Sequence, residues 1–164
     1  MEKPRPLLIQ TKWKTPPREK VHEALSAVLD ERVSIVADNR AEVWSSDRSK
    51  RYTVTWSSDL SSFGANDNAS FYQGYTGYPI LAVMLKLGVL PFRIDDCRPL
   101  RDVPWKAINK KHKNNYALAV ADVLNERLPE ASKRQAIDAY IDEVFDKLVS
   151  LELSRERPVG RPPG

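Results

Sequence analysis

The sequence contains a single cysteine, Cys97, among its 164 residues, so no internal disulfide framework is possible. A lone cysteine fits a reducing compartment. The chain also has no apolar run long enough to span a bilayer, and its first residues lack the apolar core of a signal peptide. We therefore expect a cytoplasmic protein without a membrane partner.

Motifs of the common enzyme and metal-site classes are missing as well. The sequence has no phosphate-binding glycine motif, no Gly-x-Ser-x-Gly and no His-Glu-x-x-His. His22 falls beside an apolar helical stripe, where a histidine is more often a surface or core-edge residue than a ligand, and His112 lies among lysines that disfavour its charged form. Asp95 and Asp96 should raise the pKa of the Cys97 thiol and make it a poor nucleophile. We expect no cofactor and no metal, and a non-enzymatic protein is favoured.

What the chain does contain is typical of one globular domain. Hydrophobic residues make up 41% of it and charged residues 29%, with a net charge of +4 and a pI near 9.2. This charge permits an anionic partner without requiring one. We predict an N-terminal arm over residues 1–15, a single domain over 16–153, and a disordered basic tail rich in proline and glycine over 154–164.

The stretch Arg51–Gly88 carries the strongest pattern. Tyr52, Val54 and Trp56 alternate with polar residues, as in a half-buried strand. Further on, Pro79 suits the first position of a helix whose other residues are nearly all apolar, and the final glycine suits its end. A helix that is apolar on almost every side must be buried by several neighbours, so we predict that it forms the core.

The remaining patterns predict an α+β fold with the order α-β-β-β-α-α-α. It comprises a helix, a three-stranded antiparallel meander, the buried apolar helix and two further helices. Thr15 should cap the first helix, Asp102 the third, and Ser132 with Gln135 the last. A fourth short strand over residues 60–63 is possible. The expected elements are helix 16–30, strands 32–37, 41–46 and 51–56, helix 79–88, helix 104–128 with a break near residue 114, and helix 132–153.

Residues 57–78 join the last strand of the meander to the apolar helix. A long connection without secondary structure is often functional. Its aromatic residues could anchor a protein partner, or they could belong to an ordered Ω-loop that covers the helix. Asp67 could act as a general base or magnesium ligand of a hydrolase-type enzyme, although Asn-Asp-Asn is equally a turn signal. The candidate protein-interaction residues are Phe71, Tyr72, Tyr75 and Tyr78.

Lysines gather in the first half of the helix expected over residues 104–128. Lys106, Lys110 and Lys113 fall on one helical face, with Lys111 beside them and Asn109 interleaved. Lysine neutralises phosphates, and asparagine donates to phosphates or base edges. The run is also compatible with a solvated helix face.

The segment from about Ser46 to Gly88 resembles a SWIM zinc finger. Tyr52-Thr53-Val54 and Ile80 to Leu85 match the strand and helix of that family in type and order. None of the residues at the ligand positions binds zinc, so the resemblance implies a metal-free relative. The SWIM family is associated with binding DNA and proteins. The residues at the ligand positions are Ser61, Phe63, Gly77 and Pro79.

The C-terminal tail is similar to an AT-hook. Gly160-Arg161-Pro162 matches the core of that motif, with Arg157 upstream, whereas Val159 stands where the family prefers arginine. Such an arginine is attracted to the narrow groove of A·T-rich DNA. Together with the lysine face, this likeness makes a DNA-binding module the leading interpretation. A protein-interaction module built on residues 57–78 is the alternative.

Overall fold

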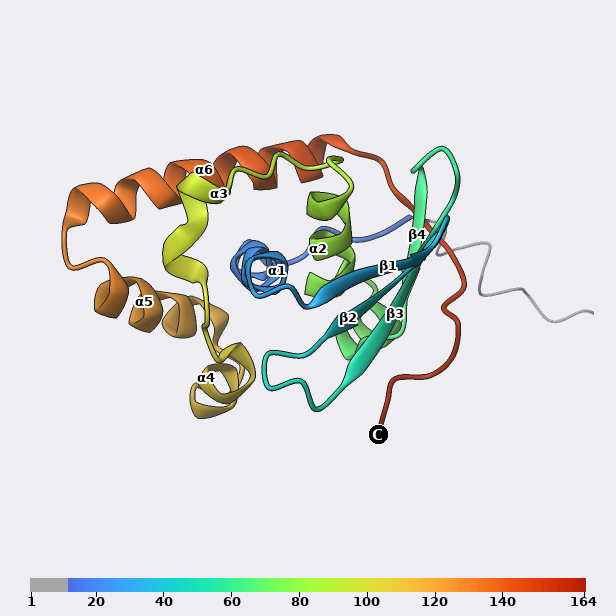
Figure 1. Ribbon diagram of the computed structural model, residues 1–164, viewed down its shortest axis with the longest axis horizontal. Coiled ribbons are helices and arrows are strands. Elements are labelled where there is room, and N and C mark those ends of the chain that lie inside the picture. Colours follow the sequence, from blue (N-terminus) through green and yellow to red (C-terminus); the bar gives the residue numbers. More distant parts are fainter. Residues whose placement is uncertain (1–11) are drawn as a thin grey trace, which may run out of the picture.

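The computed structural model describes residues 12–164, which form one α+β unit (Figure 1). Its sheet has five strands in the order β1-β2-β3-β4-β5. The first four are antiparallel neighbours, as their short connections require, and β5 lies parallel to β4. The strands are β1 (Val33–Ala37), β2 (Arg40–Trp44), β3 (Arg51–Trp56), β4 (Ser62–Ala65) and β5 (Ser154–Arg155).

Six α-helices surround this sheet or pack beside it. In Figure 1, α1 and α2 lie in the middle of the molecule, with the sheet to one side and α4 and α5 to the other, and α6 runs along the top of the view. A π-helical turn, η2 (Ala69–Gln73), precedes α2, and a 3-10 turn, η3 (Arg98–Leu100), follows α3. The helices are α1 (Lys20–Leu29), α2 (Tyr78–Lys86), α3 (Ile94–Cys97), α4 (Trp105–Lys111), α5 (Tyr116–Arg127) and α6 (Ala131–Ser150). None of the helices within residues 12–164 is both long and apolar enough to cross a membrane.

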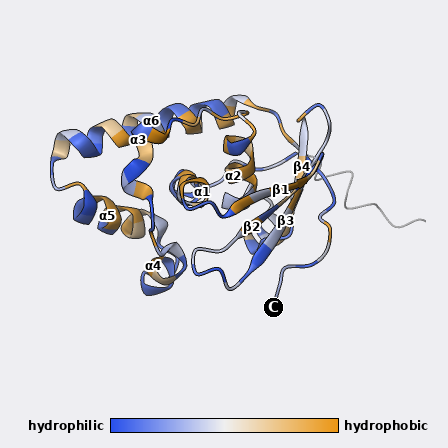
Figure 2. Ribbon diagram, in the orientation of Figure 1, coloured by the Kyte–Doolittle hydropathy of each residue, from blue (hydrophilic) through white to orange (hydrophobic). Residues whose placement is uncertain are grey.

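The predicted apolar helix is α2, and it is the core of the fold. Its residues from Pro79 to Leu85 are all buried. It packs against α1, whose Leu25 is fully buried, and against Val54 and Phe63 of the sheet. Figure 2 shows the hydrophobic residues of α1 and α2 concentrated in this central region. The predicted α+β class and the order of its elements are confirmed.

Several predicted helix ends were wrong. The first helix begins at Lys20 and not at residue 16, because the Pro17 carbonyl closes a separate turn by accepting from the Lys20 amide. The break predicted near residue 114 in the helix expected over 104–128 is confirmed: α4 and α5 are separated by residues 112–115, where Lys113 and Asn114 have positive φ angles of 51° and 63°. Ser132 lies inside the first turn of α6 and cannot cap it, and Asp102 precedes the N-cap of α4 by two positions.

Residues on both sides of the predicted domain 16–153 contact it. Trp13 donates its indole N–H to the Phe63 carbonyl at 2.9 Å, and its amide bonds to Leu153. Ser154 and Arg155 pair with β4 because that strand would otherwise be an open sheet edge. Residues 1–11 of the predicted N-terminal arm lie outside the described residues.

The expected long loop over residues 57–78 is largely structured. It contains the strand β4 and the turn η2. The possible fourth strand, predicted over residues 60–63, is therefore present as β4 but begins two residues later than predicted. Gly77 then starts α2 as its N-cap. The segment therefore belongs to the framework of the domain.

Candidate functional site

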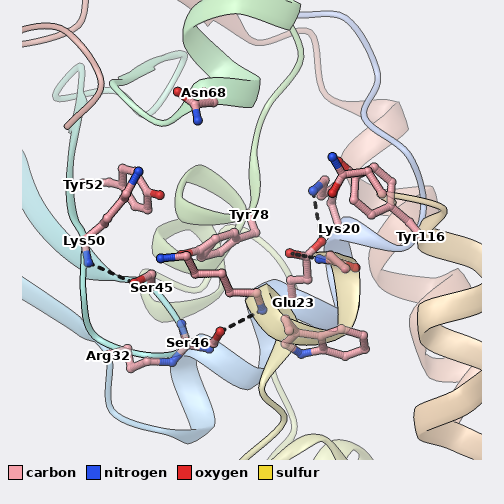
Figure 3. Close-up of a pocket in the computed structure, with 14 residues that line it drawn as sticks. Lys20, Glu23, Arg32, Ser45, Ser46, Lys50, Tyr52, Asn68, Tyr78 and Tyr116 are labelled. Atoms are coloured by element: carbon pink, nitrogen blue, oxygen red, sulfur yellow. Dashed lines mark hydrogen bonds and ion pairs between the residues drawn. The ribbon is translucent and has the colours of Figure 1, made fainter. Parts of the chain in front are cut away.

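A polar cavity of about 230 Å³ opens between α1, the β2–β3 hairpin and the α4–α5 corner (Figure 3). The loop that joins β2 and β3 contributes side chains to the cavity, and so does the residue immediately before η2. Because these elements are far apart in sequence, only the folded chain brings them together. The cavity is lined by Lys20, Glu23, Arg32, Ser45, Ser46, Lys50, Tyr52, Asn68, Tyr78, Trp105, Lys106, Asn109, Asn114 and Tyr116.

Positive charge dominates this pocket. Four of the lining side chains are cations, and Glu23 is the single carboxylate among them. Lys20 pairs with Glu23 at 3.1 Å, Lys106 lies 3.1 Å from Asp47, and Arg32 lies 3.8 Å from Asp30. Of the four cations, Lys50 is the one without an ion pair among residues 12–164. The four cations are Lys20, Arg32, Lys50 and Lys106.

Lys20 and Glu23 are held rigidly in the floor of the pocket. The Lys20 ammonium lies 3.8 Å from the centre of the Tyr116 ring, and Asn109 donates to Glu23 at 3.2 Å. Burial raises the pKa of Glu23, because desolvation disfavours the carboxylate more than Lys20 and Asn109 favour it. Burial opposes the charge of Lys20 too and is the largest single effect, but Glu23, Tyr116 and Tyr75 together outweigh it, so the pKa of Lys20 is raised.

Arg32 is a buried cation at the edge of the pocket. Only 2% of its surface is exposed. It donates to the Trp44 carbonyl at 2.7 Å and lies 3.8 Å from the Asp30 carboxylate. A guanidinium has five N–H donors, and Arg32 Nε has no hydrogen-bond partner among residues 12–164. This Nε is itself buried and faces Asp30, so Arg32 contributes positive charge to the pocket wall and not a free donor.

Tyrosine rings form the apolar part of the pocket wall. Tyr52 and Tyr78 meet edge to face with ring centres 6.3 Å apart, and the Tyr78 hydroxyl lies 3.5 Å from the Trp44 carbonyl. Burial raises the pKa of both phenols, so both stay neutral at physiological pH. Figure 3 shows these rings facing Lys20 and Tyr116 across the cavity.

One protein family matches this chain over residues 13–154, and its description is Uncharacterised conserved protein UCP014422. The chain belongs to this family. All of the residues that line the pocket fall within the matched range. Neither a curated protein nor a solved structure matches the chain. The SWIM-like and AT-hook-like resemblances are not addressed by these comparisons and stay predictions.

In this UCP014422 member, the predicted lysine face is divided. Lys106 and Asn109 line the pocket, and the Lys106 ammonium lies 2.7 Å from the Ser49 hydroxyl and 3.1 Å from Asp47. Lys110 is exposed on α4, whereas Lys111 lies 3.9 Å from Asp122. Lys113 lies beyond the end of α4 and does not share a face with the others, because the left-handed turn redirects the chain.

The other predicted site residues lie in two places. Arg157 and Arg161 are exposed on the chain that follows β5, where the Arg161 carbonyl accepts from Asn66 at 3.3 Å. Of the predicted aromatic anchors, Tyr78 is in the pocket wall and Tyr75 is half-buried beside Lys14. Phe71 and Tyr72 lie together in η2, and 66% of Tyr72 is exposed.

Asp67 and Cys97 are both enclosed by the protein. Asp67 is 5% exposed, accepts from the Ser70 amide at 3.1 Å and has its pKa raised by burial, so the proposed roles as general base or metal ligand lack access. Burial and then Asp96 raise the pKa of Cys97 to about 12. Among residues 12–164, no cluster of three or more His, Cys, Asp or Glu side chains could hold a metal ion.

Sequence patterns did not identify most of the pocket. Lys20 stands at the start of an amphipathic helix, where a lysine is normally solvated. Arg32 and Lys50 flank strands, and Tyr116 begins an apolar stripe. The one signal that could have been used is the i, i+3 spacing of Lys20 and Glu23 beside apolar residues.

Proposed function

We propose that this protein is a non-enzymatic nucleic-acid-binding module whose pocket accepts a phosphate-bearing nucleotide unit. One observation carries the proposal: four cationic side chains converge on a cavity that holds a single carboxylate, and that carboxylate is already paired. Lysine and arginine contacts to phosphate supply most of the affinity of such modules. The net charge of +4 favours the same class of partner.

The types of side chain in the pocket match the parts of a nucleotide. Lys50 can neutralise a phosphate, and the buried charge of Arg32 behind it adds to the positive potential. Tyr52 and Tyr116 offer ring surface to a base or sugar. Asn68 and Asn114 carry amides that donate to and accept from base edges. The volume of about 230 Å³ suits one such unit, so the rest of a nucleic acid would lie on the surrounding surface.

The surface around the pocket carries further positive charge. Lys110 is exposed on α4, one turn beyond Lys106. Arg157 and Arg161 are exposed on the C-terminal segment, where they support contact with a phosphate backbone. The sequence also predicted nucleic-acid binding for Lys110, Arg157 and Arg161.

The test is fluorescence anisotropy of a labelled single-stranded DNA of about 16 nucleotides, measured at low and moderate salt. Lys50 is half-buried in the pocket and makes no ion pair within residues 12–164, so Lys50→Glu should weaken binding without unfolding the protein. It should also reduce the slope of the logarithm of affinity against the logarithm of salt concentration by about one, because one phosphate contact is lost. Lys86→Glu, an exposed residue at the end of α2, makes the same change in net charge and is the control. Equal effects of the two substitutions would contradict a role for the pocket.

A further inference from the structure

Within residues 12–164, the base of the pocket is closed. Figure 3 shows Asn68, Tyr52, Arg32 and Tyr116 on different sides of the cavity. Six of the lining residues are no more than 9% exposed, so no second opening reaches solvent past them. A ligand therefore has to enter and leave through one mouth. The six buried lining residues are Lys20, Glu23, Arg32, Ser45, Trp105 and Asn109.

The pocket also gathers an unusual share of the buried polar groups. Five of these six residues, all except Trp105, are polar or charged, and they make up half of the ten buried polar or charged residues among residues 12–164. Glu23 Oε2 and Arg32 Nε are buried there without a hydrogen-bond partner, although each faces an opposite charge. Burial of polar and charged groups is costly, and proteins concentrate it at functional sites.

Lys50 supplies the charge that a ligand can reach. Its amide donates to the Ser45 hydroxyl at 3.0 Å, which holds the backbone in place. Its ammonium, in contrast, makes no hydrogen bond or ion pair with residues 12–164. The side-chain amides of Asn68 and Asn114 are likewise without a hydrogen-bond partner in this part of the chain. The pocket therefore holds one unmatched cation together with two amides that can donate.

A closed base restricts which part of a nucleic acid can enter. An internal nucleotide continues into the strand through both its 5′ and its 3′ oxygen, so two charged lengths of chain would have to pass through the same mouth. A terminal nucleotide has only one such connection. Because the volume of about 230 Å³ suits one nucleotide unit, the shape of the pocket favours the end of a strand.

A terminal phosphate also suits the charge of the pocket better than an internal one. A phosphomonoester carries about 1.5–2 negative charges at pH 7 and presents three strong acceptor oxygens. A phosphodiester carries one charge, so it is attracted less strongly by Lys50 and by the buried Arg32 charge. The additional acceptor oxygen can take a hydrogen bond from Asn68 or Asn114.

We infer that the pocket binds the end of a nucleic-acid strand through a terminal phosphate held by Lys50. This inference rests on the proposed function and narrows its ligand from any nucleotide unit to a phosphorylated strand end. The terminal base lies beside the tyrosine rings of the wall. The rest of the strand leaves through the mouth and follows the exposed cations, of which Lys110 is one turn beyond the pocket residue Lys106.

The experiment measures the fluorescence anisotropy of one DNA strand of about 16 nucleotides in four forms, with the label on an internal base. The forms carry a 5′-phosphate, a 3′-phosphate or no terminal phosphate, and the fourth is closed into a circle. At least one phosphorylated strand should bind about tenfold more tightly than the unphosphorylated strand, as expected for one charge-assisted contact. Which strand gains affinity identifies the end that enters, and the circle should bind no more tightly than the unphosphorylated strand.

Substitutions of Lys50 locate the contact. Both Lys50→Met and Lys50→Arg should fold, because the ammonium is bonded to no other residue among 12–164. Lys50→Met should abolish the preference for a terminal phosphate, whereas Lys50→Arg should keep it. Lys86→Met, at an exposed position at the end of α2, makes the same change in net charge as Lys50→Met and should leave the preference intact.

The outcomes separate this inference from the proposed function. If phosphorylated and unphosphorylated strands bind equally, or if the circle binds as tightly as the phosphorylated strand, the inference is overturned. The proposed function then still stands provided that Lys50→Glu weakens binding of every form. A preference that persists in Lys50→Met would place the terminal phosphate elsewhere and would also overturn the inference. Failure of every form to bind would reject the proposed function itself.

Discussion

The Lys20 ammonium lies 3.1 Å from the Glu23 carboxylate one turn later on α1, and less than a tenth of either side chain is exposed. Both charges have left water, so each depends on the other for compensation. The pair forms the floor of the pocket and also belongs to the most buried helix face of the domain. A change to this pair should therefore affect both the stability of the domain and the charge of the pocket.

Removing one member of this pair should be far more costly than removing both. Lys20→Met leaves the Glu23 carboxylate buried and unpaired, and we expect it to lower the free energy of unfolding by about 3 kcal/mol or more at pH 7. The double variant Lys20→Met/Glu23→Leu should recover most of this loss. Urea denaturation of the natural protein, the two single variants Lys20→Met and Glu23→Leu, and the double variant gives the coupling energy, and strictly additive effects would contradict a mutually compensated pair.

The Lys20→Met variant has a distinctive pH dependence. Burial already raises the pKa of Glu23, and without Lys20 that pKa should rise further. A carboxyl whose pKa is higher in the folded than in the unfolded protein binds its proton more tightly when folded. The stability deficit of the variant should therefore shrink as the pH falls from 7 toward 5, which the same urea titrations would measure.

His22 should weaken the fold in acid. The ring is fully buried on α1, and neither of its nitrogens has a hydrogen-bond partner among residues 12–164. Burial, together with the positive charge of Arg18, lowers the pKa of His22 to about 3. The unfolded chain takes up this proton near pH 6.5, so the contribution of His22 to stability is complete above that pH and is lost as the pH falls toward 3.

Replacement of His22 by leucine tests this assignment. Between pH 7 and pH 4 the loss assigned to His22 is about 3 kcal/mol, and His22→Leu should remove that part of the pH dependence. At pH 7 the variant should be at least as stable as the natural protein, because an unbonded polar ring is exchanged for an apolar side chain of similar size. Parallel stability–pH curves for the two proteins would show that His22 is not the group responsible.

Gly77 is required for steric reasons. Its φ of −71° is open to any residue, but an added Cβ would lie only 2.0 Å from the Asp67 carboxylate. Gly77→Ala should therefore lower the free energy of unfolding by about 1–3 kcal/mol through overpacking. Asp67→Ala in the same chain should restore part of the loss, because the obstructing carboxylate is gone. A destabilisation that the second substitution leaves unchanged would point to another cause.

The C-terminal segment should contribute to stability only up to β5. Leu153 is 7% exposed in the core, and the Glu156 amide bonds to the Phe63 carbonyl at 2.8 Å. Deletion of residues 157–164 should leave thermal stability nearly unchanged. Deletion of residues 152–164 should lower the free energy of unfolding by at least about 2 kcal/mol, through the loss of Leu153 burial alone. Equal melting curves for both truncations would contradict the assignment of β5 to the domain.

The sequence predictions were accurate where local residue patterns decide the structure, and they failed where contacts between distant parts of the chain decide it. The strand Arg51–Trp56 and the helix α2 were predicted to within a residue or two, because alternation and a continuous apolar pattern are local signals. The capping assignments for Asp102 and Ser132 failed, because caps depend on backbone angles that neighbouring elements impose. The strand β5 was missed, since two residues that pair with a distant edge carry no periodicity.

The amino-acid sequence by itself determined the α+β class, the apolar core helix and the basic character of the chain, since each follows from composition and from the pattern of neighbouring residues. Only the tertiary structure decided where that charge acts. It placed Lys106 and Asn109 in a pocket with Lys20 and Arg32, and it separated Lys113 from them through a left-handed turn. It also set Lys14 and Arg155, which are 141 positions apart in the numbering, beside Gly74. Such juxtapositions arise from packing of the core and not from local sequence, so the pocket could not be predicted from the sequence.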